Sequence, residues 1–247
     1  MTQHTPLRVE NPMAYSGSSW GTAPAPPHRM AVPVAAVSAV RAHTLEALDA
    51  AGLDTAGVPL PPERVGGALR PAGDIVHRFA ALHALVAYVG HPAARANTAR
   101  AAALLAARGV RAALTAREAG VFDLSAAAAA RVAASWLDDW LEGILTLAWV
   151  LGNDAAPAVD GVPASTAAAR HLLTEGAPTC AADVEVLLEV APVRHAGEVV
   201  AAADAAACAL AVAEARATRW RAGAPDVGRD RVTRARAGVL AWVVAAS

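Results

Sequence analysis

Alanine fills 69 of the 247 positions, and this bias constrains the fold more than any other feature of the sequence. Alanine has the highest intrinsic helix propensity of all the amino acids. Several residues that favour strands are scarce, because the chain holds only two Ile, two Phe and two Tyr. Small side chains also let neighbouring helices approach toward the short end of the roughly 8–10 Å range of interaxial distances. We therefore expect an all-α fold, built as a single compact Ala-rich multi-helix bundle.

All 21 basic residues are Arg, and Lys is absent. This absence excludes chemistry that needs a lysine, such as a Schiff base with pyridoxal or the phosphate-binding lysine of a P-loop. The formal net charge of -1 gives no overall field that would attract nucleic acid or an acidic membrane. The two cysteines, Cys180 and Cys208, form no C-x-x-C pair and are expected to be packed and structural. We expect no cofactor.

The first 30 residues differ in composition from the rest of the chain. They mix Ser, Gly, Pro and Thr and end near the proline run Ala23–Pro27. This composition predicts an extended or disordered arm over residues 1–30, followed by an all-helical domain over residues 31–247. The arm lacks the apolar core of a signal peptide, and the longest strongly apolar stretches fall short of about 18 residues. We therefore expect a cytoplasmic protein with no membrane segment.

Capping residues and glycines mark the ends of the expected helices. Thr115 and Glu118 have the spacing of a capping box, and Ser125 is expected to cap the longest helix. Glycines follow several of the apolar-periodic segments, as is common at helix C-termini. The expected helices cover residues 34–51, 72–90, 93–108, a short segment after Thr115, 126–151, 165–174, 181–190, 195–221 and 228–245.

Three carboxylates lie close together within the segment 126–151. Asp138, Asp139 and Glu142 have spacings that place them on one side of a helix, flanked by Trp136 and Trp140. Three interpretations remain open: a solvated face, an internal face held by salt bridges, or a site of general acid/base or metal chemistry. The D-D-x-x-E spacing is similar to the magnesium-binding helix of terpene synthases, but the second metal motif of those enzymes is absent. We therefore predict no metal site.

Asp204 and His83 are isolated polar residues in apolar surroundings. The helix stripe around Asp204 otherwise holds only Ala, Val and Cys. Because an unpaired buried carboxylate is costly, we expect Asp204 to pair with an arginine. The alternative is a functional carboxyl whose protonation is altered by its apolar setting. His83 lies close to the apolar seam of its helix, where it is expected at the edge of the core and is a candidate substrate contact.

The only concentration of basic residues lies between positions 216 and 236, where two aspartates accompany the arginines. The seven arginines are Arg216, Arg219, Arg221, Arg229, Arg231, Arg234 and Arg236. No recognised nucleic-acid motif accompanies them, so nucleic-acid binding is not favoured. We expect these arginines to pair with the carboxylates, or to bind an anionic group of a small molecule or a partner.

Several segments, taken in order, resemble a known family. They are Arg41–Leu45, Leu48–Gly52, Leu69–Arg70, Leu147–Gly152, Asp204 and Arg236–Trp242. Their order resembles the bacterial family catalogued as domain-of-unknown-function family 4272, over residues 38–246. The resemblance implies an all-helical domain and no established activity.

Two hypotheses of function follow. The first is a cofactor-independent enzyme, or enzyme subunit, that acts on a small molecule by acid/base chemistry in a bacterial small-molecule pathway, such as one for a specialised metabolite. Its candidate acids and bases are Asp138, Asp139, Glu142 and Asp204, and its candidate substrate contacts are Trp136, Trp140, His83, Arg234 and Arg236. The second is a noncatalytic interaction or ligand-binding protein that docks a partner through its Arg-rich C-terminal end and its N-terminal arm.

Overall fold

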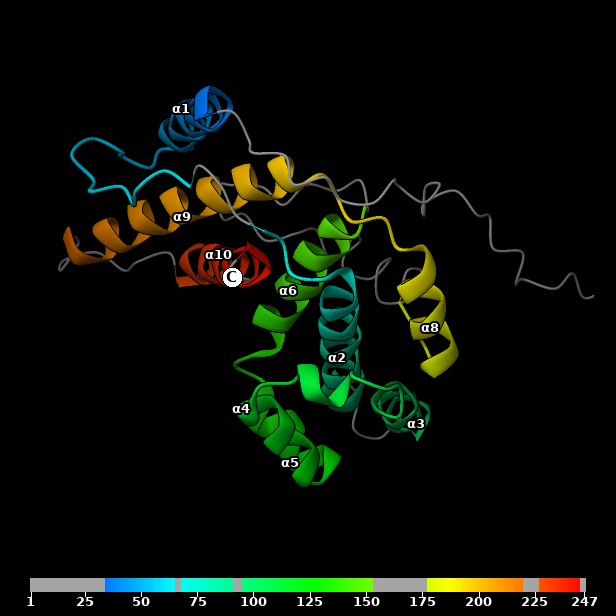
Figure 1. Ribbon diagram of the computed structural model, residues 1–247. Coiled ribbons are helices and arrows are strands. Elements are labelled where there is room, and N and C mark those ends of the chain that lie inside the picture. The colour runs from blue at the N-terminus through cyan, green and yellow to red at the C-terminus, as the bar shows by residue number, and fades with distance from the viewer. Residues whose placement is uncertain (1–33, 65–67, 91–94, 153–176, 220–226, 245–247) are drawn as a thin grey trace, which may run out of the picture.

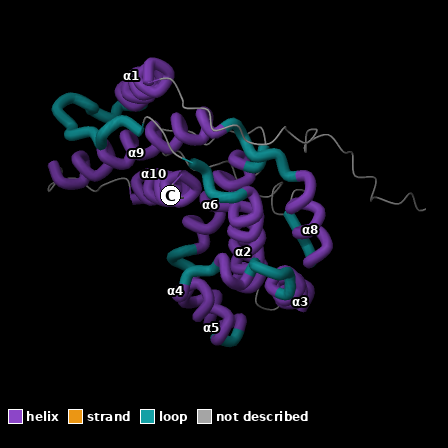
Figure 2. The backbone as a smooth tube through the Cα atoms, in the orientation of Figure 1, coloured by secondary structure: helices purple, strands orange, loops and turns teal. Residues whose placement is uncertain are grey.

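Every regular element in the described part of the chain is a helix (Figures 1 and 2). The computed structural model describes residues 34–64, 68–90, 95–152, 177–219 and 227–244. Its α-helices are α1 (Val34–Ala50), α2 (Ala72–Gly90), α3 (Arg95–Leu105), α4 (Ala116–Ala119), α5 (Ala126–Ala133), α6 (Leu137–Val150), α8 (Ala181–Val190), α9 (Ala196–Arg219) and α10 (Val227–Val244). Two 3₁₀-helices, η1 (Arg111–Ala113) and η2 (Gly120–Asp123), flank α4. The expected all-α fold is confirmed, whereas the arm 1–30 and the helix expected at 165–174 lie outside the described residues.

The predicted caps form as expected. Thr115 Oγ1 accepts a hydrogen bond from the backbone N–H of Glu118 at 3.3 Å, and Glu118 Oε2 accepts one from the Thr115 N–H at 2.8 Å. Ser125 Oγ accepts from the Ala128 N–H at 3.3 Å. These bonds satisfy N–H groups that have no partner within their own helix.

The prediction of one long helix over 126–151 is wrong. The segment breaks between Ala133 and Leu137, where the Trp136 N–H bonds to the Ala133 carbonyl in an i to i-3 turn. Two arginines from other segments contact the residues at this break. Arg231 donates to the Ser135 carbonyl, and the Arg117 guanidinium lies 3.6 Å from the centre of the Trp136 ring. The Arg231 bond occupies a carbonyl that a continuous helix would pair with an N–H four residues later, which favours the break between α5 and α6.

The largest core surrounds α2, which packs against α3, α5, α6 and α8. Figure 1 shows α2 in the middle of this group, with α3 and α8 on one side and α6 on the other. The side chains of Phe79, Leu82 and Leu85 on α2 are almost completely buried. Burial around most of the circumference of α2 makes it the central helix of this part of the protein.

A second, smaller apolar cluster joins α1 to α9. Leu48 and Leu53 from α1 and the turn after it pack against Ala209 and Val212 on α9. Helix α9 also contacts α10, and α10 in turn contacts α6. Helix α9 therefore connects the N-terminal segment to the main core.

Helix α9 is long and apolar enough to cross a membrane by length and composition, which corrects the expectation that no segment reaches this threshold. Its stretch Ala196–Thr218 has a mean hydropathy of 1.6 over its most apolar window. However, 56% of that window is buried inside the protein, and Asp204 within it is ion-paired to Arg41. The core helix of a soluble protein passes the same test, so this feature is weak evidence for a membrane span.

Two glycines in the interiors of helices provide a matched test of how closely the helices pack. A Cβ at Gly238 in α10 would meet no atom within 4 Å, whereas a Cβ at Gly143 in α6 would lie 3.0 Å from Cδ1 of Leu82 on α2. We expect Gly238→Ala to raise the free energy of unfolding by about 0.5–1 kcal/mol, because Ala is the better helix former. Gly143→Ala is expected to lower it, because overpacking costs about 1–3 kcal/mol.

Urea unfolding of the two variants beside the wild type measures both effects. An equal gain in stability from both substitutions would contradict the close approach of α6 to α2.

Candidate functional site

The acidic trio on α6 is engaged by arginines from α10. Arg231 Nε lies 2.6 Å from Asp139 Oδ1, and Arg231 Nη1 lies 3.3 Å from Asp138 Oδ2. Arg236 Nε and Nη2 each lie 2.9 Å from Glu142 Oε2. The Glu142 side chain is only 8% exposed, against 42% for Asp139 and 68% for Asp138. All three carboxylates of the trio are therefore in salt bridges with arginines. Only Glu142 lies on an internal face, as one of the three interpretations predicted, whereas Asp138 and Asp139 are exposed to solvent.

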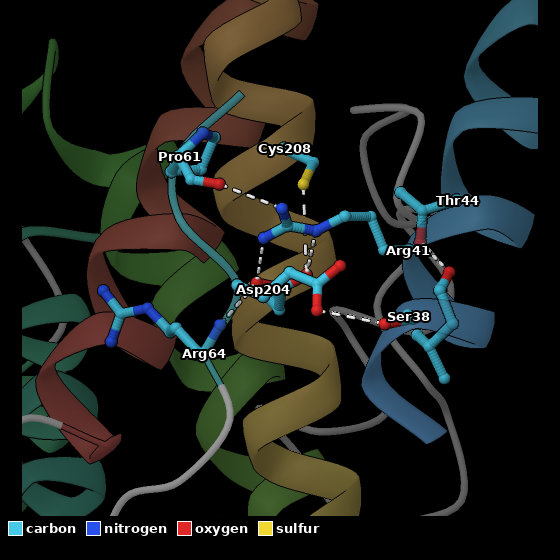
Figure 3. Close-up of polar contacts among 9 residues, drawn as sticks. Ser38, Arg41, Thr44, Pro61, Arg64, Asp204 and Cys208 are labelled. Atoms are coloured by element: carbon cyan, nitrogen blue, oxygen red, sulfur yellow. Dashed lines mark hydrogen bonds and ion pairs between the residues drawn. The ribbon is translucent and has the colours of Figure 1, made fainter. Parts of the chain in front are cut away.

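Asp204 forms a buried ion pair with Arg41 (Figure 3). This confirms the prediction that the partner of Asp204 is an arginine. Arg41 reaches from α1 and donates through Nε at 2.8 Å and Nη2 at 2.5 Å to the two carboxylate oxygens. The backbone N–H of Arg64 adds a third bond to Asp204 at 3.1 Å, and Arg41 Nη1 donates to the Pro61 carbonyl at 2.9 Å. One carboxylate on α9 thus holds both α1 and the extended segment that follows it.

The thiol of Cys208 lies beside this ion pair, with Sγ 4.0 Å from Asp204 Oδ2. Burial raises the pKa of the Cys208 thiol, even though the nearby Arg41 acts to lower it. A raised pKa keeps the thiol protonated and a poor nucleophile. Cys208 is therefore a packing residue, as its sequence context indicates.

The four candidate carboxylates are not brought together in one site. Asp204 faces α1 from α9, whereas the trio faces α10 from α6. Of the four, Asp139 alone lines the cleft described below.

A cleft of about 830 Å³ lies between α2, α6, α10 and the segment that contains η1 and α4. Four arginines line it: Arg70, Arg78, Arg231 and Arg234. The indole rings of Trp140 and Trp242 supply apolar walls. Small residues line much of the remainder, among them Gly109, Ala112, Gly143, Ala235 and Gly238. The cleft combines cationic and aromatic surface with open space, as small-molecule sites commonly do.

Three of the four cleft arginines have partners within the protein. Arg78 forms a two-fold ion pair with Glu118, at 2.5 and 2.8 Å, and Arg231 pairs with Asp139. Arg70 donates from Nε to the Trp242 carbonyl at 2.8 Å, and its guanidinium lies 4.6 Å from the centre of the Trp242 ring.

Arg234 differs from the other three cleft arginines. It is exposed, and it makes no hydrogen bond or ion pair with any residue of the described ranges. Its charge is therefore available to a ligand, whereas the charges of Arg78 and Arg231 are paired with carboxylates.

His77 on α2 also lines the cleft, and its position depends on Gly109. Gly109 has φ of +90°, and a Cβ at that position would lie 2.5 Å from Cε1 of His77. His77 Nε2 is buried and makes no hydrogen bond within the described part of the chain. His77 was not among the candidate site residues predicted from the sequence, because its closeness to Gly109 arises only in the folded chain.

The remaining candidate substrate contacts lie elsewhere. His83 is 1% exposed, packs edge-on against the Phe79 ring, and is not among the cleft residues. Burial, followed by the charge of Arg100, lowers the pKa of His83 from 6.5 to about 3, so its imidazole is neutral near pH 7. Arg236 is buried with Glu142, and Trp136 packs under Arg117 and against Trp140.

Of the substrate contacts proposed from the sequence, Trp140 and Arg234 line the cleft, while Arg70, His77 and Trp242 were missed. One signal could have found part of this set. Arg231, Arg234, Gly238 and Trp242 recur every three or four residues and share one face of α10. Within the described residues, no group of three or more His, Cys, Asp or Glu side chains is placed to hold a metal ion.

Comparison with known proteins identifies the family. Residues 41–247 match the model of the Domain of unknown function (DUF4272), and because this match covers most of the chain, the protein belongs to that family. The matched region includes both partners of the Arg41–Asp204 pair and all the residues that line the cleft. No curated protein and no solved structure matches the chain.

Breaking the Arg41–Asp204 pair tests its structural importance. Asp204→Ala leaves the Arg41 guanidinium, which is only 12% exposed, without its carboxylate. We expect a loss of about 3–5 kcal/mol in the free energy of unfolding, measured by urea denaturation. The matched control is Glu198→Gln, which removes a 57% exposed partner of Arg194 and should cost less than about 1 kcal/mol. Similar losses in both variants would contradict a special role for the buried pair.

The Arg78–Glu118 pair predicts a pH dependence of stability. Burial acts to raise the pKa of Glu118, but the hydrogen bonds and charge of Arg78, together with the hydrogen bonds of Thr115, outweigh it, so the pKa lies below its ordinary value of 4.5. A carboxyl whose pKa is depressed by folding stabilises the protein above its unfolded pKa, and this contribution is lost as the pH falls through the folded pKa.

Wild type should therefore be more stable than Glu118→Gln at pH 7, and the difference should shrink as the pH falls below the ordinary pKa of 4.5. Urea unfolding of both proteins between pH 7 and pH 3 measures this trend. A difference that stays constant or grows toward acidic pH would show that the charged form of Glu118 is not the stabilising one.

Proposed function

We propose that the protein binds a small organic anion in the cleft between α2, α6 and α10, with Arg234 as the main contact to the anionic group. The observation that carries this proposal is the exposed Arg234 in a cleft where the charges of Arg78 and Arg231 are already paired with carboxylates. A guanidinium is well suited to carboxylate or phosphate groups, because it presents several N–H donors in one plane.

The rest of the cleft favours an anion with an organic body over an inorganic ion. Arg234 and Trp242 lie eight residues apart on α10, which separates them by about 12 Å along the helix axis. Between them, Ala235 and Gly238 leave room for a bound molecule. A ligand that contacts both ends of this face therefore has an anionic group at one end and an apolar or ring-shaped part at the other.

Binding is favoured over acid/base catalysis by the four candidate carboxylates. Asp138, Asp139, Glu142 and Asp204 all accept contacts from arginine side chains, and Asp204 lies on a different helix from the other three. Proton transfer by these groups would compete with ion pairs that hold the helices together. The proposed ligand belongs to a bacterial small-molecule pathway in the cytoplasm, as expected from the sequence.

A panel of organic anions tests the proposal. Citrate, phenylpropionate, phenyl phosphate and adenosine monophosphate are titrated into the full chain, and binding is followed by calorimetry and by chemical-shift changes in NMR spectra. For those that bind, we expect Arg234→Gln to weaken affinity about tenfold or more, because a hydrogen bond to a charged group contributes about 1.5–3 kcal/mol.

The matched control is Arg131→Gln, which removes an exposed arginine on α5 that does not line the cleft. Its affinity for the same anions should equal that of the wild type. Failure of every anion to bind, or equal weakening by Arg234→Gln and Arg131→Gln, would refute the proposal.

A further inference from the structure

We infer that His77 is a second ligand contact, and that the ligand therefore carries a hydroxyl group in addition to its anionic group. This inference rests on the proposed function and specifies its ligand class as a hydroxy acid or a phosphate ester that keeps a free hydroxyl. The inference comes from the juxtaposition of His77 and Arg234, on α2 and α10, in the lining of one cleft.

The first support is the hydrogen bonding of His77. Its Nε2 atom is buried, yet it makes no hydrogen bond with the residues that the structure describes. Buried polar atoms are satisfied in the great majority of cases, so an exception needs an explanation. His77 also lines the cleft, so a molecule bound there lies beside this residue.

The second support is the way in which the imidazole is held in place. Gly109 packs so closely over the ring that its hypothetical Cβ would lie between 2.5 and 2.9 Å from Cε1, Nδ1 and Nε2. The backbone at Gly109 is fixed in turn, because its carbonyl accepts a hydrogen bond from the Ala113 N–H at 3.2 Å. A side chain held in this way loses little freedom when it binds a ligand, which favours affinity.

The third support is the state of the other polar groups around the cleft. Arg78, next to His77 in sequence, is occupied by Glu118 and by the Ala113 carbonyl. A neutral imidazole has one N–H donor and one acceptor nitrogen, and a hydroxyl can serve as partner to either. The combination of Arg234 and His77 therefore matches a molecule with one anionic group and one hydroxyl.

Two aromatic acids that differ by one hydroxyl test this inference. Phenyllactate carries a hydroxyl beside its carboxylate, and phenylpropionate lacks it. We expect the wild-type full chain to bind phenyllactate about fivefold more tightly, as measured by calorimetry, since one neutral hydrogen bond contributes a factor of this order. His77→Phe should abolish this preference, measured as the ratio of the affinities for the two acids.

Three further variants distinguish the ligand contact from a structural role. His77→Gln retains a hydrogen-bonding side chain and should restore part of the preference. His43→Phe changes an exposed histidine on α1, outside the cleft lining, and should keep the whole preference. Arg234→Gln should weaken both acids equally. In addition, the imidazole ¹⁵N signals assigned to His77 should shift on addition of phenyllactate but not of phenylpropionate.

The outcomes separate the two proposals. Equal affinity of the wild type for the two acids, or a preference that survives in His77→Phe, overturns the assignment of His77, and the proposed function stands if Arg234→Gln still weakens both acids. If Arg234→Gln leaves both affinities unchanged, the proposed function fails. If neither acid binds the wild type, the hydroxy-acid assignment is overturned, and the anion panel alone decides the proposed function.

Discussion

Arginine–carboxylate pairs join helices that pack through apolar faces, and the buried face of α9 among them consists mostly of alanine and valine. Small, similar side chains give neighbouring helices few features that would prevent one from sliding along another. A charged pair opposes such sliding, because breaking it leaves a charge without a partner in a poorly solvated place. Arg41–Asp204 joins α1 to α9, and Arg236–Glu142 joins α10 to α6. We regard these pairs as the elements that set the register of the bundle.

The same small residues that permit close helix packing also create the cleft. Gly109, Gly143 and Gly238 line it, and each leaves space where a larger side chain would stand. At Gly109 the His77 imidazole occupies the space that a side chain would need. At Gly238 the space remains open. Ion pairing and small residues thus produce a cleft in which Arg234, His77 Nε2 and the exposed Asp74 side chain have no partner among the described residues.

Local signals in the sequence predicted most helix ends well. Thr115 and Ser125 cap their helices as expected, because a cap depends on residues within one turn. The single helix expected over 126–151 failed for a reason that no local pattern carries. Its break at Ser135 and Trp136 is accompanied by contacts with Arg231 and Arg117, which arrive from other parts of the chain.

The sequence by itself predicted an all-α fold, favoured arginine as the partner of Asp204, and indicated that this carboxylate would need a partner or an altered protonation. Only the tertiary structure decided which arginine it would be, since Arg41 and Asp204 lie 163 positions apart. It also decided which candidates share a cleft: Trp140 and Arg234 do, whereas His83 is in the core. Composition acts through local propensity and the cost of burying charge, but a site depends on distances that exist only after the helices pack.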